Sequence, residues 1–180
     1  FAIAIGGEAG QGIATPGDIL ARIFVRRGLH LNTYNAYQSI IRGGHIFLYV
    51  RVCDQEIHTH GDKLDLLVCL NQDTMDRHLQ LMGPGSAVLY NGDNITPGEA
   101  ADGVQMCPLP VAELSNTRNR LSQNTMAVGS AAYLLGLDFE VLEESLTLRF
   151  QRQGQAVIDE NVGVARAGYD HAAANFKAFA

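Results

Sequence analysis

The first residues of the chain have the types and spacing of an anion-binding turn. Phe1 to Ile5 are apolar and partly β-branched, as in a buried central strand. Four glycines follow within seven residues, at Gly6, Gly7, Gly10 and Gly12. Glycine lets the backbone turn sharply and bring its N–H groups close to an anion. The segment therefore predicts a site for a phosphate-bearing ligand, with a plain tight turn between strand and helix as the alternative.

A helix must begin directly after these glycines if its N-terminus is to face the anion. Thr15 has the character of an N-cap, Pro16 suits the first helical position, and Asp18 completes a capping box. We expect this helix over residues 16–27, ended by Gly28.

A second candidate segment lies between two predicted strands, at residues 34–45 (YNAYQSIIRGGH). Arg42 precedes Gly43 and Gly44 in a stretch without acidic residues, so its guanidinium is available for phosphate or carboxylate. The strand before this loop is expected to run parallel to the first strand, which places both loops at one edge of the sheet. The alternative is that Arg42 pairs with a distant acid or with a partner chain.

The glycine spacing argues against two common nucleotide-binding classes. It differs from the dinucleotide pattern G-x-G-x-x-G, and Tyr34 and Asn35 stand where an acidic residue would bind the ribose. No Gly-Lys-Ser/Thr follows the glycines, as a P-loop requires. We therefore expect neither a free NAD site nor a P-loop.

Other polar residues could do chemistry but have a simpler interpretation. His58 and His60 alternate and could bind a metal from one face of a strand, yet the sequence offers no third ligand nearby, which favours solvent-facing histidines. Ser39 has His45 close in sequence but lacks the glycines of a nucleophile elbow, which favours a turn hydroxyl. Asn124 is expected to cap the helix that follows it.

The composition restricts the class of protein. With 180 residues, 47% hydrophobic, the chain is long enough for one well-buried domain, and a net charge of −6 argues against a nucleic-acid or anionic-membrane surface. No apolar run reaches the roughly 20 residues of a transmembrane helix, and the start lacks signal-peptide features, so we expect a cytoplasmic protein. The chain has three cysteines, Cys53, Cys69 and Cys107, which are far apart and lie within apolar, strand-like segments. We therefore expect buried small residues rather than a disulfide framework or the ligands of an iron–sulfur cluster.

Strand-like and helix-like segments alternate along the chain. This order predicts an α/β fold with a Rossmann-like, mostly parallel sheet covered by helices on both faces, and a helical C-terminal third. The expected strands cover residues 1–5, 30–34, 45–52, 64–70, 87–90 and 104–107. The expected helices cover residues 16–27, 71–81, 111–121, 125–135, 139–150 and 164–179. Met126 and Gly129 are expected to be packing residues, and Tyr133, Leu134 and Leu135 to belong to the core.

Several segments together resemble one known family. They are GGEAGQGIAT, YQSIIRGGH, LNQDTMDRH, NTMAVGSAAYLLGL and DENVGVARAGYDHA. In this order they resemble the gamma domain of the 2-oxoacid:ferredoxin oxidoreductases, over nearly the whole chain. The last two are most similar to the form fused to the front of the alpha chain, as in 2-oxoglutarate:ferredoxin oxidoreductases. Residues 1–180 would then be a single gamma-type domain within a longer alpha chain or a multi-subunit complex, with which the lack of an initiator Met agrees.

The resemblance implies a division of labour. In this family thiamine diphosphate attacks a 2-oxoacid, carbon dioxide leaves, electrons pass through iron–sulfur clusters to ferredoxin, and coenzyme A takes the acyl group. The gamma domain would help to bind coenzyme A and close over the active site, with alpha and beta parts as partners and thiamine diphosphate, Mg and the clusters held elsewhere. It would be inert alone. The family pattern assigns coenzyme A contacts to Gly7, Gly10, Gln11, Gly12, Arg42, Gly43, Gly44, Asn71 and Gln72, and it also has an Asn at position 124.

One residue departs from the family pattern. Glu8 stands among the first glycines, where a carboxylate beside a phosphate would be repulsive, so we expect it to point away or to contact a partner. Two other functions stay open: a non-catalytic docking module of the same complex, and a free-standing nucleotide-binding protein. The sequence does not identify the oxoacid.

Overall fold

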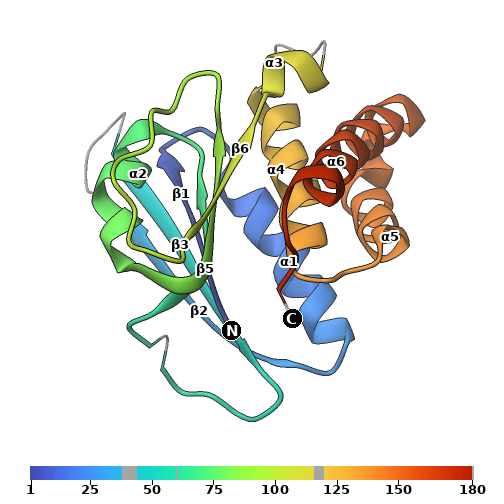
Figure 1. Ribbon diagram of the computed structural model, residues 1–180. Helices are drawn as coiled ribbons and strands as arrows, with labels where there is room; N and C mark the ends of the chain where they lie inside the picture. Colours follow the sequence, from blue (N-terminus) through green and yellow to red (C-terminus); the bar gives the residue numbers. More distant parts are fainter. Residues whose placement is uncertain (38–43, 60, 116–119, 180) are drawn as a thin grey trace.

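The computed structural model describes residues 1–37, 44–59, 61–115 and 120–179. Its centre is one six-stranded sheet (Figure 1), with the strands in the order β2-β3-β1-β4-β5-β6. The strands are β1 (Ala2–Glu8), β2 (His30–Tyr37), β3 (His45–Cys53), β4 (Leu64–Cys69), β5 (Met82–Asn91) and β6 (Gln105–Leu109).

Helices follow most strands and fill the C-terminal third. They are α1 (Ala14–Arg26), α2 (Gln72–His78), α3 (Val111–Leu114), α4 (Arg120–Leu134), α5 (Phe139–Phe150) and α6 (Gln155–Asn175), with short 3-10 turns η1 (Leu79–Leu81) and η2 (Gln151–Gln153). The predicted α/β class with a helical C-terminal third is confirmed. No helix in the described part of the chain is long and apolar enough to cross a membrane.

Five of the six strands run in the same direction. β1, β4, β5 and β6 pair in parallel, whereas β3 is antiparallel to both β1 and β2. β2 is therefore parallel to β1, as predicted, and the chain leaves both strands at the same edge of the sheet. The sheet is mostly parallel, with β3 as the exception.

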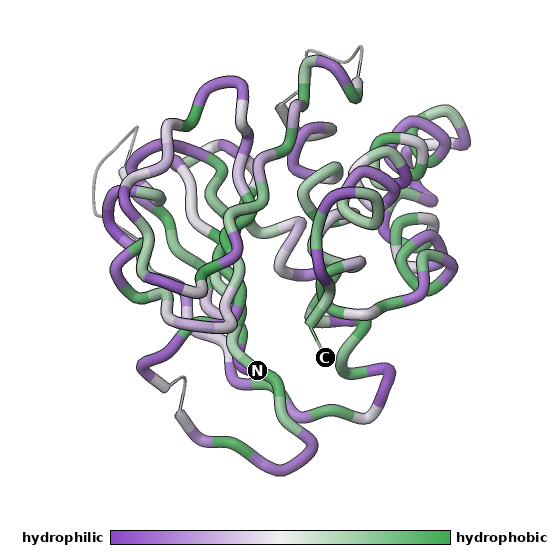
Figure 2. Tube along the Cα trace, viewed as in Figure 1, coloured by the Kyte–Doolittle hydropathy of each residue, from purple (hydrophilic) through white to green (hydrophobic). Residues whose placement is uncertain are grey.

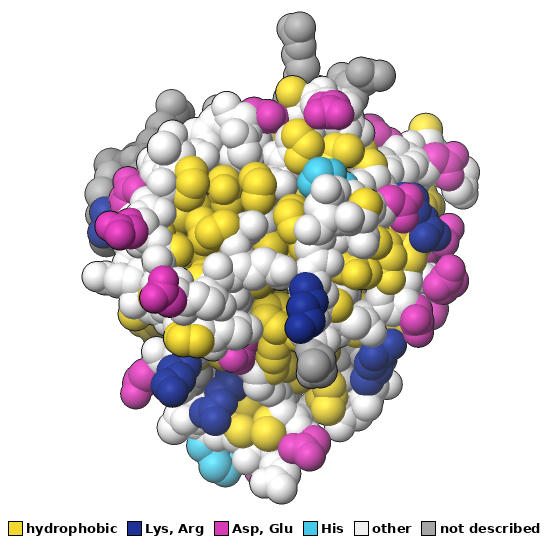
Figure 3. All heavy atoms as spheres, viewed as in Figure 1, with side chains coloured by type: hydrophobic (Ala, Val, Ile, Leu, Met, Phe, Trp, Pro, Cys, Tyr) yellow, Lys and Arg dark blue, Asp and Glu magenta, His cyan; other side chains and the backbone are white. Residues whose placement is uncertain are grey.

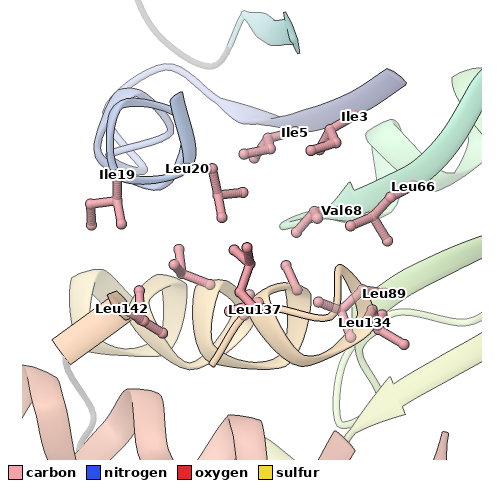
Figure 4. Packing of buried hydrophobic residues seen from close by; sticks show 14 of the residues in the cluster. Ile3, Ile5, Ile19, Leu20, Leu66, Val68, Leu89, Leu134, Leu137 and Leu142 are labelled. Atoms are coloured by element: carbon pink, nitrogen blue, oxygen red, sulfur yellow. The ribbon is translucent and has the colours of Figure 1, made fainter. Parts of the chain in front are cut away.

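One face of the sheet packs against the large helices. Figure 4 shows Ile3 and Ile5 of β1 and Leu66 of β4 facing side chains from α1, α4 and α5. Ile19 and Leu20, on the predicted apolar side of α1, are each 1% exposed. This continuous apolar cluster is the main core, and it fixes the position of the turn between β1 and α1.

The opposite face has a smaller cover. α2, η1 and the segment 92–104 lie over it, and Met75 and Leu79 pack on Leu67 and Val88 in a second apolar cluster. Figure 2 shows hydrophobic residues concentrated in the strands and hydrophilic ones in the outer loops. The expectation of helices on both faces holds, although on this face only one short α-helix contributes.

Glycines allow α4 and α6 to pack closely. A Cβ at Gly129 of α4 would overlap the carbonyl oxygen of Ala165, and one at Gly168 of α6 would overlap the carbonyl oxygen of Met126. Ser130 Oγ also donates to the Gly168 oxygen across this contact, at 2.7 Å. The packing role expected of Met126 and Gly129 is thus confirmed, as is the burial of Leu134, whereas Tyr133 and Leu135 are only partly buried.

Two predicted helix caps are wrong. α1 begins at Ala14, its N-cap position is Ile13, and that residue makes no side-chain cap bond, so Thr15 already lies inside the helix. The turn is made by Gly12, whose φ of 76° leads the chain into the helix directly. Pro16 becomes the third helical residue, where it is tolerated because the first four N–H groups of a helix have no intrahelical partner. Asn124 likewise lies inside α4.

Some element boundaries also differ from the predicted ones. β2 and β5 extend beyond the predicted segments, and α6 begins at Gln155, well before the predicted start. β6 continues through Pro108, which an edge strand tolerates. The single helix expected over residues 111–121 is wrong beyond Leu114: α3 ends there, Ser115 has an extended backbone, and Arg120 already begins α4, with residues 116–119 outside the described part.

Candidate ligand-binding cleft

The cleft lies where the chain crosses from one face of the sheet to the other. β1 continues into α1 on the main-core face, whereas the neighbouring parallel strand β4 continues into α2 on the opposite face. Ligands of open α/β sheets bind in the crevice that this divergence leaves outside the carboxyl ends of the strands. A cleft of about 270 Å³ opens here, and it is lined by Glu8, Gln11, Leu70, Asn71, Gln72, Asn91, Asn94, Ile95, Gln123 and Asn124.

The glycine turn after β1 forms one wall of this cleft. Gly10 and Gly12 have φ values of 92° and 76°, which side chains rarely permit, so glycine is needed at both positions. The Gln11 N–H donates to the Glu8 backbone carbonyl oxygen at 3.0 Å, and Gln11 Oε1 accepts the Glu8 N–H at 2.6 Å. The side-chain oxygen of Gln11 therefore stabilises the turn itself.

Asn71 and Gln72 form the opposite wall. Asn71 is the N-cap of α2, and its Oδ1 accepts the Thr74 N–H at 3.0 Å and the Thr74 hydroxyl at 2.7 Å. Gln72 Nε2 donates to the Thr96 carbonyl at 2.9 Å, and Gln72 Oε1 accepts the Thr96 N–H at 2.8 Å. Both predicted residues line the cleft, but their side chains are already engaged within the fold. The Asn71 side chain caps α2, and the Gln72 side chain binds the backbone of the segment after β5.

Asn124 joins the glycine turn to the C-terminal helices. Its Nδ2 donates to the Gln11 carbonyl oxygen, and its side chain is 7% exposed. The interpretation of Asn124 as a helix cap is wrong because α4 starts one turn earlier, so that its side chain contacts the glycine turn instead. A second cavity of about 310 Å³ lies beyond Asn124, between α1, α4, α5 and α6. Gly12 lines this second cavity rather than the cleft.

The predicted Arg-Gly-Gly segment is described only at its last residue. The Ala9 N–H donates to the Gly44 carbonyl oxygen at 3.0 Å, so this segment ends directly beside the glycine turn. Arg42, Gly43 and Ser39 lie outside the described residues, as does His60.

Glu8 is partly exposed and lines the cleft, whereas it was expected to point away from a phosphate or to contact a partner. It is the last residue of β1, paired with His45 of β3, so its position follows from the register of the sheet. A carboxylate here lowers the affinity of this wall for anions.

Three polar residues of the cleft were missed at the sequence level. Asn91 ends β5, Asn94 follows it, and Gln123 belongs to α4. The two asparagines could have been found, because β5 is parallel to β4 and its carboxyl end must meet the same edge. Gln123 carried no such signal, since its place depends on how α4 packs.

A pair of histidines lies next to the cleft: His45 begins β3, and His78 ends α2. His45 is 8% exposed, and its Nε2 is 2.8 Å from His78 Nε2, so one of these two ring nitrogens donates a hydrogen bond to the other. His45 Nδ1 is 3.5 Å from Asp73 Oδ2, and the His78 ring stacks on Phe47 at 3.9 Å between centroids.

Burial is the main cause of a lowered pKa in both histidines. It lowers the pKa of His78 to about 4, with the neighbouring His45 and Arg77 acting in the same direction. Burial also lowers the pKa of His45, and the Asp73 carboxylate only partly opposes this effect. Both histidines are therefore neutral at pH 7.

The cysteines lie on three separate strands. Cys53 ends β3 and is partly exposed, whereas Cys69 and Cys107 are buried, as expected. Burial raises the pKa of the Cys107 thiol to about 12 and that of Cys69 still further. Residues 1–37, 44–59, 61–115 and 120–179 contain no group of three His, Cys, Asp or Glu side chains that could hold a metal ion. The donor set does not fit an iron–sulfur cluster.

Comparisons with known proteins agree with this architecture. A family model described as pyruvate ferredoxin/flavodoxin oxidoreductase matches residues 2–171. Ketoisovalerate oxidoreductase subunit VorA from Methanothermobacter thermautotrophicus is 28% identical over 179 residues, which are 97% of this chain and 37% of that protein. The 2-oxoglutarate synthase subunit KorC from Archaeoglobus fulgidus is 25% identical over 93% of this chain and 86% of its own length.

A solved structure has the same fold over almost the whole chain. It is a 2-oxoglutarate:ferredoxin oxidoreductase from Magnetococcus marinus with 2-oxoglutarate, coenzyme A and succinyl-CoA bound, with a TM-score of 0.88 and 26% identity. The match covers 99% of this chain and 32% of that one, so this chain spans about a third of the longer relatives. The sequence resemblance is confirmed at the level of the family: the chain belongs to the pyruvate ferredoxin/flavodoxin oxidoreductase family.

Proposed function

We propose that this chain is the gamma domain of a thiamine-diphosphate-dependent 2-oxoacid:ferredoxin oxidoreductase of the 2-oxoglutarate type. Within that complex it binds coenzyme A and closes over the active site, while alpha and beta parts hold the thiamine diphosphate and pass electrons towards ferredoxin. The observation that carries the proposal is the cleft at the divergence of β1 and β4, in a chain whose family match covers residues 2–171. The Magnetococcus marinus relative, which contains coenzyme A, supports the choice of ligand.

The cleft offers backbone rather than side-chain contacts to a phosphate. Gln11, Asn71 and Gln72 use side-chain atoms within the fold, so the backbone of the turn from Glu8 to Gln11, both of which line the cleft, is what a diphosphate can approach; Gly10 in this turn is exposed. A Cβ at Gly10 would meet no atom within 4 Å, which leaves the turn open to a ligand. The Arg-Gly-Gly segment ending at Gly44 adjoins this turn, and Arg42 would add the positive charge.

Calorimetric titration of the purified chain with coenzyme A tests the cleft. Asn94 is exposed and lines the cleft without capping a helix, so Asn94→Trp fills the space and should raise the Kd for coenzyme A at least about tenfold. Gln80→Trp adds the same bulk on exposed η1, outside the cleft, and should leave the Kd unchanged. NAD and ADP serve as competitors, and tighter binding of NAD would overturn the assignment.

A substitution at Glu8 should strengthen coenzyme A binding, whereas Asn94→Trp should weaken it. Glu8→Gln removes a carboxylate from the cleft wall at nearly constant volume and should tighten coenzyme A binding about fivefold, because a like charge near 4 Å in water costs about 1 kcal/mol. The gain should shrink at high salt. Unchanged affinity would place the phosphates away from the glycine turn.

A docking module without a ligand of its own is the second candidate. The internal hydrogen bonds of Asn71 and Gln72 favour it, since these side chains are engaged within the fold. Arg42→Ala in the assembled enzyme separates the two functions. A higher coenzyme A requirement supports ligand binding, whereas loss of the complex with unchanged coenzyme A dependence supports docking.

A further inference from the structure

An arginine-lined groove lies between α1 and α5, away from the cleft. It has a volume of about 410 Å³, and Arg22 and Arg26 of α1 face Arg149 of α5 and Arg152 of η2 across it. The chain has 13 Lys and Arg residues against 19 Asp and Glu, so four of its cations meet in one groove of an acidic protein. On the face shown in Figure 3, by contrast, basic side chains are scattered among acidic ones.

Carboxylates of the chain do not neutralise this groove. Asp18 is the acidic residue in its lining, and Glu144 lies 3.5 Å from Arg26. The side chains of Arg26 and Glu144 are 53% and 70% exposed, and an ion pair so open to water contributes little. Within the described part of the chain, Arg22 and Arg152 have no such ion pair. The groove therefore keeps an excess of positive charge.

Local helix energetics account for only part of the cluster. Arg26 and Arg149 lie in the last turns of their helices, where a cation interacts favourably with the helix dipole. Arg152 lies in the last turn of η2, which directly continues α5, so the same explanation extends to it, whereas Arg22 is in the middle of α1 and does not have this explanation.

The lining favours a polypeptide over a small phosphate compound. Phosphate sites use backbone N–H groups at a glycine turn or a helix N-terminus, whereas this groove runs along the sides of α1 and α5 towards their C-termini. Arg22 and Arg26 are four residues apart, which spreads the charges by about 6 Å along α1 instead of focusing them on one point. Leu148 adds an apolar group that is 40% exposed among the arginines.

We propose that this groove docks an acidic polypeptide segment of another part of the complex. Guanidinium groups bind carboxylates in a bidentate manner, and arginine is enriched at protein interfaces. Successive carboxylates of the segment pair with the two rows of arginines, and an apolar side chain covers Leu148. Because this chain spans about a third of its longer relatives, most of the polypeptide that could supply the segment lies outside it.

Binding of a defined acidic peptide tests the proposal. The probe is a fluorescein-labelled peptide of nine glutamates with one central leucine, followed by anisotropy at low salt. Arg22→Glu with Arg152→Glu should weaken binding at least tenfold. Lys63→Glu with Lys177→Glu changes the net charge equally at two sites outside the groove and should have less than a twofold effect. Arg22→Gln with Arg152→Gln, a milder pair, should reproduce the loss if the reversal impairs folding.

Three results would overturn the proposal: no binding of the peptide at low salt, equal losses in the groove and control variants, or displacement of the peptide by tripolyphosphate at lower concentration than by unlabelled peptide. The last would identify a phosphate site. The test is independent of the cleft. Asn94→Trp should leave peptide binding unchanged, and the groove variants should leave the coenzyme A titration unchanged.

Discussion

The two faces of the sheet are held in different ways. On the face of α1 and α4, apolar side chains form one continuous core, and glycines bring α4 against α6 at backbone distance. On the face of α2, a smaller apolar cluster is supplemented by the Asn71 cap, the tie from Gln72 to Thr96 and the histidine pair. The first face therefore depends mainly on close apolar packing, whereas the second also depends on polar groups and on the ionisable histidine pair.

This difference bears on the cleft, which lies between the two faces. The glycine turn is anchored on the apolar side through α1 and Asn124, whereas its opposite wall is the start of α2. Few buried apolar contacts and many polar ones are typical of the parts of a protein that open at low free-energy cost. We infer that any closure around a ligand involves the α2 wall rather than the α1 wall.

The largest expected loss of stability comes from a substitution in the close contact between α4 and α6. Gly129→Ala should lower the free energy of unfolding by about 3 kcal/mol, because the new Cβ overlaps the backbone of Ala165 and forces α4 from α6. Urea denaturation followed by circular dichroism measures the change.

Gly163→Ala in α6 is the matched control, because a Cβ there meets no atom within 4 Å. Alanine at such an open helical position should stabilise the protein by about 0.5–1 kcal/mol. A stabilising Gly129→Ala would contradict the close packing of the two helices.

The next largest effect is the pH dependence of stability that His78, on the α2 face, should cause. The pKa of His78 is about 4 in the folded protein and about 6.5 when unfolded, so below pH 6.5 the unfolded state binds a proton that the folded state excludes. The contribution of His78 to stability should therefore be constant above pH 7 and fall by about 1.5 kcal/mol between pH 7 and pH 5, less than a fully buried ring would lose. Denaturation midpoints at several pH values measure this loss.

His78→Phe provides the comparison, since phenylalanine can stack on Phe47 without titrating. The part of the pH dependence due to this histidine should disappear in the variant. An unchanged pH profile would show that the pair does not control the stability of this face.

The smallest effect is at the cap of α2. Asn71→Ala removes the acceptor for two Thr74 donors and should cost about 1 kcal/mol, whereas Asn71→Asp, which keeps an acceptor, should cost much less. Thermal unfolding of the two variants measures the difference. Equal losses in both would mean that the cap does not support α2.

Parts of the site could be predicted because their signals are local. The turn at Gly10 and Gly12 follows from glycine after an apolar strand, and the nearness of Gly44 follows from β2 being parallel to β1. The roles of Gln11 and Asn71 could not be predicted, since an amide that binds a ligand and one that stabilises a turn or caps a helix have the same sequence appearance. The cap assigned to Thr15 failed because Gly12 makes the turn without one.

The sequence by itself determined the order of most strands and helices and the glycine turn, because hydrophobic periodicity and turn residues act over a few neighbouring positions; the family followed separately, from the resemblance of several motifs. Only the tertiary structure decided which distant groups meet. Asn124 reaches Gln11 across 113 positions, and Arg22 comes to face Arg152 although neither neighbourhood predicts the other. Such contacts depend on how whole helices pack on the sheet, and that packing is the sum of many apolar contacts that no short segment contains.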